Sequence, residues 1–200
     1  MKFVNQLDYP HIHYSHNLSH PEMPQMKEGT FAKSACGLAS PMMGADRLLV
    51  NYKFDIRDAM ALIYETGANK GIGSKIRYAC PVFAHRFGLD FEMTNDPEAV
   101  RNCLRTGGCV IACSGGDREG YTGIFTHGGH YIVLINEERD GRIAILDPAY
   151  KEGKYDEEAR KDKVQVLPGA AKDKIILSDM QTLVEDCSNR DPGFYMFWRK

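Results

Sequence analysis

Apolar residues recur with helical spacing through much of the first half of the chain. In FDIRDAMALIYETGA, residues 54–68, apolar side chains fall three and four positions apart, and Asp55 is a suitable N-cap. The same spacing predicts a helix over 73–89, interrupted by its proline, and another over 96–108, which glycines end. Residues 1–35 contain several prolines, so we expect extended and loop structure there.

Short apolar runs with β-branched residues replace this pattern in the second half. CVIACS (109–114), HYIVLIN (130–136) and RIAILD (142–147) predict strands, and the second is apolar on both faces, as central strands are. Between the first two, SGGDREGYTGIFTHGG (114–129) holds six glycines and predicts a mobile loop. The charge run KEGKYDEEARKDK (151–163) predicts a solvated surface excursion.

Two further strands, VQVLP and GFYMFW, complete the expected elements, with a short helix in ILSDMQTLVEDC between them. Helices come first and antiparallel strands second, and this order predicts an α+β fold. We expect a single domain over 1–200, with a helical part at about 30–108 and an antiparallel β-sheet part at about 109–200.

The hairpin formed by the second and third predicted strands brings two ionisable residues together. If residues 138–141 form a four-residue loop, the strands pair so that Asp147 lies opposite Ile132. His130 is two residues before Ile132, so its side chain shares a face with Asp147 at a diagonal distance of about 7 to 8 Å. A three-residue loop would move Asp147 to the other face, and Asp147-Pro148 is also a common way to begin a turn.

Composition limits the classes of function. The 200 residues, 43% of them hydrophobic, are enough to build a substantial core. A net charge of −2 predicts no strong electrostatic binding to nucleic acid. The sequence contains no uninterrupted apolar run of about 18 residues, so we expect no membrane-spanning helix. The N-terminal sequence lacks the apolar region of a signal peptide, which favours a cytoplasmic location unless a signal has been removed. None of the six cysteines forms a CxxC pair, so we expect mostly buried, reduced thiols.

One cysteine stands where a loop becomes a helix. In TFAKSACGLASPMM, Cys36 precedes Gly37 and an apolar run, so we expect its thiol at a helix N-terminus, where the helix dipole favours the thiolate. A thiolate nucleophile needs a base, and His130 is distinctive because it opens the most apolar strand. Asp147 could then hold the histidine's tautomer and orientation. Taken singly, Cys36 is better interpreted as an ordinary core cysteine, and a core histidine bonded to a carbonyl is an equally good interpretation of His130.

Three motifs occur in the order found in papain-like cysteine peptidases: Cys36-Gly37, GGHYIVL around His130, and ILDP around Asp147. The chain resembles most closely the branch typified by the peptidases that cut double-glycine leader peptides from bacteriocins, together with its stand-alone bacterial relatives, from about residue 13 to 198. The resemblance implies a papain-like fold with a cleft between the helical part and the sheet. It implies Cys36 as nucleophile, His130 as general base and acid, Asp147 as the residue that orients the histidine, a peptide or protein substrate, and no metal or organic cofactor.

The chain departs from this branch at the glutamine that helps to form the oxyanion hole in relatives. Within HYSHN, His16 occupies the glutamine's place, so His16 or Asn17, or else Gln25, would have to supply the second donor. Loss of one such donor typically slows a reaction about 100- to 1000-fold. Leu38-Ala39 also replaces the Pro and Thr or Ser that often follow the Cys-Gly pair.

Two other functions fit the same residues. Transglutaminases and related acyltransferases have Cys, His and Asp in this order, but an amine resolves their acyl-enzyme. A papain-like domain that binds peptides or regulates a partner without turnover is also compatible, because His16 replaces the glutamine. A metal site built from His11, His13, His16 and His20 is less favoured, since their spacing fits no common structural zinc pattern.

Overall fold

The structure, a computed structural model, describes residues 2–14, 29–50, 52–69, 73–168 and 174–200. It has the predicted α+β order, with most helices before the strands. The helices are η1 (Gln6–Asp8, a 3-10 helix), α2 (Phe31–Ser34), α3 (Cys36–Leu48), α4 (Ile56–Glu65), α5 (Ile76–Phe87), α6 (Pro97–Arg105) and α7 (Met180–Cys187). The strands are β1 (Leu89–Thr94), β2 (Cys109–Ser114), β3 (His130–Glu137), β4 (Ile143–Leu146), β5 (Gln165–Val166), β6 (Ile175–Ser178) and β7 (Phe194–Arg199).

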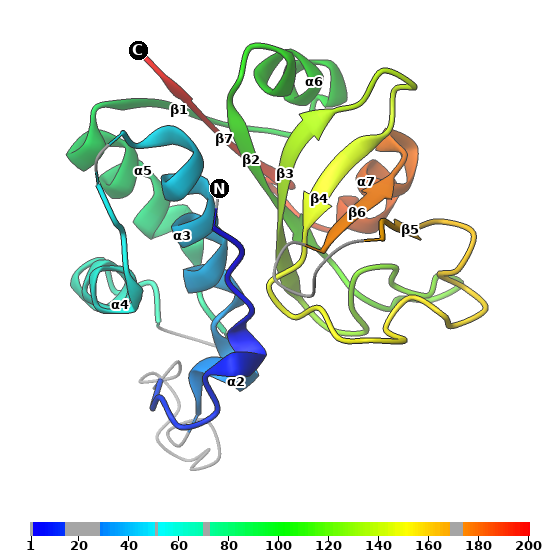
Figure 1. Cartoon of the computed structure of the whole chain (residues 1–200), viewed down its shortest axis with the longest axis horizontal. Helices are drawn as coiled ribbons and strands as arrows, with labels where there is room; N and C mark the ends of the chain where they lie inside the picture. The colour runs from blue at the N-terminus through cyan, green and yellow to red at the C-terminus, as the bar shows by residue number, and fades with distance from the viewer. Residues whose placement is uncertain (1, 15–28, 51, 70–72, 169–173) are drawn as a thin grey trace.

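Within the described residues, seven strands form one antiparallel sheet in the order β1-β7-β2-β3-β4-β6-β5. Helices cover both faces: α3, α4 and α5 lie on one side, and α6 and α7 on the other (Figure 1). Val133 of β3 belongs to the core shared with α3, α4 and α5, whereas its neighbours Ile132 and Leu134 belong to the core beneath α6 and α7. The prediction of a central strand that is buried on both faces is therefore confirmed.

Helix ends follow the local chemistry of the sequence. Asp55 caps α4, and its carboxylate accepts hydrogen bonds from the N–H groups of Arg57 and Asp58 in a capping box. Pro81 does not interrupt α5, which is continuous through it, so the expected break there is wrong. Burial of apolar residues on both sides of Pro81, such as Phe83, outweighs the lost hydrogen bond.

The sheet begins earlier in the chain than predicted. Residues 89–94 form the edge strand β1, which pairs with β7, so the sheet part starts at Leu89 rather than near residue 109. The first residues of the predicted ILSDMQTLVEDC helix form β6 instead, and α7 starts only after Asp179, which caps it. When a short strand is followed directly by a capped helix, the sequence shows neither a clear strand alternation nor a clear helical spacing of apolar residues.

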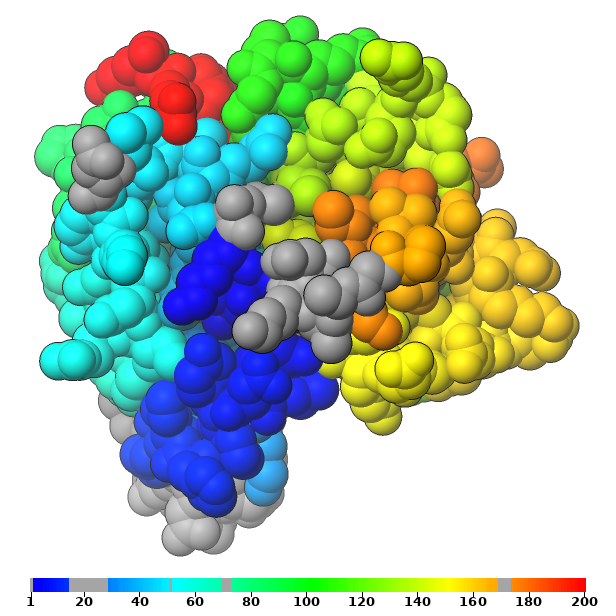
Figure 2. Space-filling view, in the orientation of Figure 1, coloured from blue at the N-terminus to red at the C-terminus, as the bar shows by residue number. Residues whose placement is uncertain are grey.

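The N-terminal segment packs across the two parts of the molecule. Figure 2 shows it in blue, between the cyan helices and the yellow and orange strands. The Gln6 N–H donates to the carbonyl of Pro148 at 2.6 Å, and Asn5 Nδ2 donates to the carbonyl of Tyr150 at 2.8 Å. These bonds hold the turn that follows Asp147. Among the described helices, none has both the length and the hydropathy needed to cross a bilayer.

Candidate active site

Cys36 is the first residue of α3, as predicted. The short helix α2 ends two residues earlier, and the Ala35 carbonyl accepts the first hydrogen bonds of α3, from the N–H groups of Leu38 and Ala39 at 2.9 and 2.8 Å. The Cys36 residue is partly exposed, and its thiol lies in a largely buried environment. A side chain at Gly37 would place its Cβ 2.7 Å from the Cβ of Ser74, which explains why glycine follows the cysteine.

The Cys36 thiol lies within interaction range of the His130 imidazole, and each group shifts the pKa of the other. Burial by itself raises the pKa of the Cys36 thiol, but the hydrogen bond and charge of His130, with the N–H groups of Tyr131 and Gly37, lower it below its usual value. Burial lowers the pKa of His130, but the charge and hydrogen bond of Asp147, followed by those of Cys36, raise it to about 9. Both directions favour a thiolate paired with an imidazolium.

His130 and Asp147 lie in contact, as the hairpin pattern predicted. His130 Nε2 is 2.7 Å from Asp147 Oδ1, and both side chains are buried. The expected loop length is wrong, however. Glu137 pairs with Ile143, which leaves a five-residue loop at 138–142, and the register then shifts by one residue between Leu134 and Asn136. Beyond this bulge the strands have the predicted register, in which Asp147 extends β4 to the position opposite Ile132.

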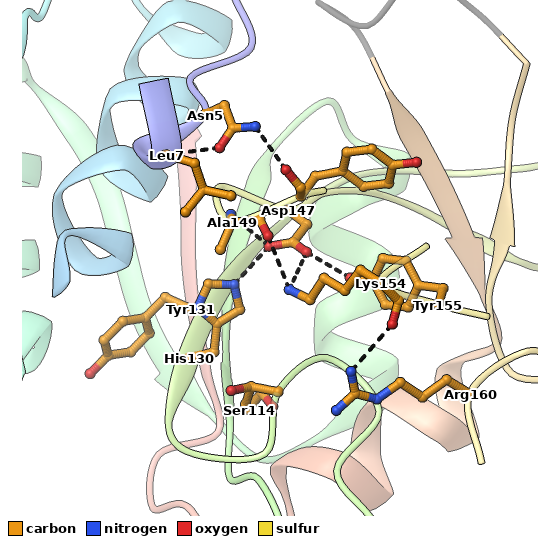
Figure 3. Close-up of polar contacts among 12 residues, drawn as sticks. Asn5, Leu7, Ser114, His130, Tyr131, Asp147, Ala149, Lys154, Tyr155 and Arg160 are labelled. Atoms are coloured by element: carbon orange, nitrogen blue, oxygen red, sulfur yellow. Dashed lines mark hydrogen bonds and ion pairs between the residues drawn. The ribbon is translucent and has the colours of Figure 1, made fainter. Parts of the chain in front are cut away.

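The Asp147 carboxylate is fully buried and accepts from four groups (Figure 3). Oδ1 accepts from His130 Nε2 and, at 2.9 Å, from the N–H of Ala149; Oδ2 accepts from Lys154 Nζ and, at 2.7 Å, from the Tyr155 hydroxyl. Burial raises the pKa of Asp147, but the charges of Lys154 and His130 and their hydrogen bonds hold it well below its usual range. Such complete pairing offsets the cost of burying the charge.

The segment 151–163 only partly forms the solvated excursion that its charges predicted. Tyr155 and Arg160 are both 3% exposed, and the Lys154 side chain is 10% exposed. Arg160 donates through Nε to the Gly123 carbonyl at 3.1 Å and through a terminal nitrogen to the Lys154 carbonyl at 3.3 Å. The charge pattern alone therefore gave no indication of Lys154 and Tyr155 at the site, and the aromatic residue within the charge run was the available signal.

The glycine-rich loop between β2 and β3 is anchored more firmly than a mobile loop would be. Ile124 and Phe125 are buried in the core under α7. The buried carboxylate of Asp186 accepts from the Ser114 hydroxyl, from the Tyr121 hydroxyl at 3.0 Å and from the Ile124 N–H at 2.7 Å. These hydrogen bonds fix the position of the segment that precedes His130.

The predicted oxyanion-hole residues His16 and Asn17, and the substitute Gln25, lie outside the described residues. All six cysteines are free thiols, and four of them are buried, in line with the expectation of mostly buried thiols. Across the parts of the chain that the structure describes, no group of three or more His, Cys, Asp or Glu side chains could hold a metal ion. His11 and His13 are described and belong to no such group.

Comparison with known proteins finds similar structures, six chains in all, but no similar sequences. No family model matches the sequence, and no curated protein matches it. The structure is similar to a crystal structure described as a candidate C39-like peptidase from Bacillus anthracis, with a TM-score of 0.42 and 14% sequence identity. The match covers 72% of this chain and 87% of that chain.

Proposed function

We propose that the protein is a cysteine peptidase or related amide hydrolase that cleaves peptide bonds through an acyl-enzyme on Cys36. One observation carries the proposal: the thiol at the start of α3 faces His130, which in turn contacts the buried carboxylate of Asp147. A thiol with a lowered pKa, on a residue that is partly exposed, and a positioned base are the groups that covalent catalysis at a carbonyl requires.

In this mechanism the Cys36 thiolate attacks the carbonyl carbon of the scissile amide. Because His130 Nε2 is bonded to Asp147, Nδ1 remains to face the sulfur and the substrate. The imidazolium donates its proton from Nδ1 to the leaving amine, and the C–N bond breaks. Neutral His130 then takes a proton from water, whose oxygen attacks the thioester, and Cys36 leaves as the thiolate. Asp147 keeps the imidazole in one tautomer and stabilises its charged form.

The tetrahedral intermediate places a negative charge beside the start of α3. We assign its stabilisation to the Cys36 N–H, at the positive end of the helix, and to a side-chain donor from His16 or Asn17. A hollow of about 370 Å³ borders His130 and is lined by residues that include Phe125, Thr126, His127, Ala149 and Gly153. It lies on the side of His130 where Lys154 and Arg160 also line the wall, and it offers space for part of a substrate.

The pH dependence of Cys36 alkylation tests this proposal, with Cys113 as an internal control. Both residues are partly exposed, but burial is the main cause that raises the pKa of the Cys113 thiol to about 11. Iodoacetamide should therefore label Cys36 selectively near pH 6, as read by mass spectrometry, and His130→Ala should abolish the low-pH labelling. If Cys36 reacts only at alkaline pH, like Cys113, or if His130→Ala changes nothing, the catalytic proposal fails.

A second assay separates hydrolysis from the alternatives. A peptide library is incubated with the protein, with and without a primary amine, and products are identified by mass spectrometry. Hydrolysed products support the peptidase, and amine-capped products instead indicate an acyltransferase. A reactive Cys36 with no product, together with retention of peptides on the protein, would indicate a binding domain.

A further inference from the structure

Two side chains other than Cys36 and His130 donate hydrogen bonds to the second oxygen of the Asp147 carboxylate. Lys154 Nζ and the Tyr155 hydroxyl both donate to Oδ2, while His130 holds Oδ1 (Figure 3). Burial, followed by the charge of Asp147, raises the pKa of Tyr155 well above its usual value, so the hydroxyl keeps its proton and donates. One carboxylate therefore serves two positively charged partners at once.

Lys154 is held in this position from several sides. Its Nζ also lies 3.5 Å from the Ala149 carbonyl, and it lies 5.5 Å from the centre of the Tyr155 ring. Its own carbonyl accepts from Arg160, which is bonded in turn to Gly123 of the loop that leads to His130. The lysine is thus fixed by its backbone as well as by its charge.

The surrounding charges leave Asp147 as the only carboxylate among the described residues that contacts Lys154 Nζ. Two acidic side chains on the same segment have other partners: Glu157 contacts Arg160 and His127, and Glu152 contacts Lys174. The other titratable or charged groups that face this cluster are Cys36, His130, Tyr155, Asp186, Lys151 and Arg160.

We propose that Lys154 is a positioning residue of this site, which shares the Asp147 carboxylate with His130 and thereby limits how strongly His130 holds its proton. The inference rests on the proposed function. Lys154 touches neither the thiol nor the reacting bond, and it acts only through Asp147. In a hydrolase that works by proton transfer, such sharing lets the imidazolium give its proton to the leaving amine more readily.

The direction in which the pKa of His130 changes follows from the charges of Lys154 and Asp147. A neutral residue at 154 would leave the whole carboxylate charge to His130, so the imidazolium would become more stable and the pKa of His130 would rise. Unit charges about 6 to 12 Å apart, as on either side of a shared carboxylate, interact at an effective dielectric constant of about 20 by the equivalent of one to two pH units, and relaxation around the mutated residue reduces this to about one. The loss of a nearby positive charge would also raise the pKa of Cys36 by a smaller amount, because Lys154 reaches it only across Asp147 and His130.

The test is the NMR titration of the His130 imidazole in full-length protein with Cys36→Ala, where no thiolate complicates the curve. Lys154→Met should raise the pKa of His130 by about one unit, and Lys154→Arg, which keeps the charge, should leave it within about 0.3 unit. Tyr155→Phe removes a neutral donor from the same oxygen and should give a smaller rise. If Lys154→Met does not fold, Lys154→Gln, which is also neutral but polar, decides the question and should give the same rise.

A purely structural lysine gives a different result. In that case Lys154→Met would lower the denaturation midpoint but leave the pKa of His130 unchanged, and the inference would be overturned; a lower pKa would overturn it as well. The outcome is independent of turnover. If no peptide is cleaved and His130 still shifts upward, the hydrolase proposal fails and the shared carboxylate stands. If peptides are cleaved and the pKa of His130 does not shift, the hydrolase proposal stands and the shared-carboxylate inference fails.

Discussion

Replacing Asp147 by Asn tests the electrostatic basis of the site most directly. Asparagine has almost the same shape, but it carries no charge and only one acceptor oxygen. Four donors converge on Asp147, two on each oxygen. If the amide oxygen faces His130 and Ala149, the amide NH₂ must face Lys154 and the Tyr155 hydroxyl. If the amide is flipped, the NH₂ faces His130 instead, so neither orientation satisfies all four donors.

The expected loss of Cys36 reactivity can be derived from the pKa of His130. The rise from 6.5 to about 9 in a buried imidazole corresponds to about 3 kcal/mol in favour of the imidazolium, and Asp147 is the largest favourable contributor. Without the carboxylate charge, burial dominates and the pKa of His130 falls to its ordinary value or lower. His130 is then largely neutral near pH 7, and the thiolate of Cys36 loses its counterion. We expect the rate of Cys36 alkylation at pH 6 to fall about 100-fold or more.

The variant would also be less stable. Lys154 would be left as a nearly buried cation without its carboxylate, at a cost of about 3 kcal/mol or more. The double variant Asp147→Asn/Lys154→Met removes both charges, so it should recover much of the unfolding free energy in a urea titration. It should not recover the reactivity of Cys36 at low pH.

Alkylation by iodoacetamide at pH 5 to 9, with mass spectrometry of the Cys36 peptide, measures the kinetic part of this prediction. The double variant is the matched control, because it separates loss of charge from loss of fold. If either variant is folded and labels Cys36 at pH 6 within about threefold of the wild-type rate, Asp147 does not maintain the ion pair. The charge of Asp147 would then not be the cause of the raised pKa of His130.

Three further changes have defined outcomes. Gly37→Ala drives a Cβ into the serine before α5 and should cost about 1 to 3 kcal/mol in a denaturant titration, whereas Gly128→Ala, where a Cβ meets nothing within 4 Å, should be nearly neutral. Asp186→Ala leaves three donors without their acceptor and should cost about 3 kcal/mol, with faster amide hydrogen exchange in the glycine-rich loop. In Cys36→Ala, the contribution of His130 to the free energy of unfolding should be fully present below about pH 6.5 and should decrease as the pH rises. The reason is that the pKa of His130 in the folded protein stays raised by its carboxylate partner. Wild type should vary less over that interval, because the lowered pKa of Cys36 adds stability as the pH rises.

Local sequence patterns were sufficient to predict the elements that carry the site. The apolar run of β3, the returning strand β4 and the helix that starts at Cys36 all occur where periodicity and loop-to-helix signals placed them. The contact between His130 and Asp147 could be predicted because strand pairing converts sequence distance into a shared face. The roles of Cys36, His130 and Asp147 in catalysis remain predictions that the alkylation experiments test.

The residues that support Asp147 could not be predicted in the same way. Lys154 and Arg160 lie in a segment where charged residues outnumber apolar ones, and such segments are usually solvated. Their burial depends on partners far away in the fold, such as the Gly123 carbonyl. A charge pattern records which residues can pair, but it does not record which carboxylate or carbonyl the folded chain brings within reach.

The β3–β4 bulge shows how narrowly the site depends on one residue of register. A five-residue loop without a bulge would place Asp147 opposite Val133, whose side chain lies on the face covered by α3. Asp147 would then be separated by the sheet from the face that His130 shares with Ile132. The extra residue of β3, Ile135, cancels the longer loop and returns Asp147 to the face of His130. Because loop length and bulge compensate, the sequence pattern predicted the correct contact from an incorrect loop.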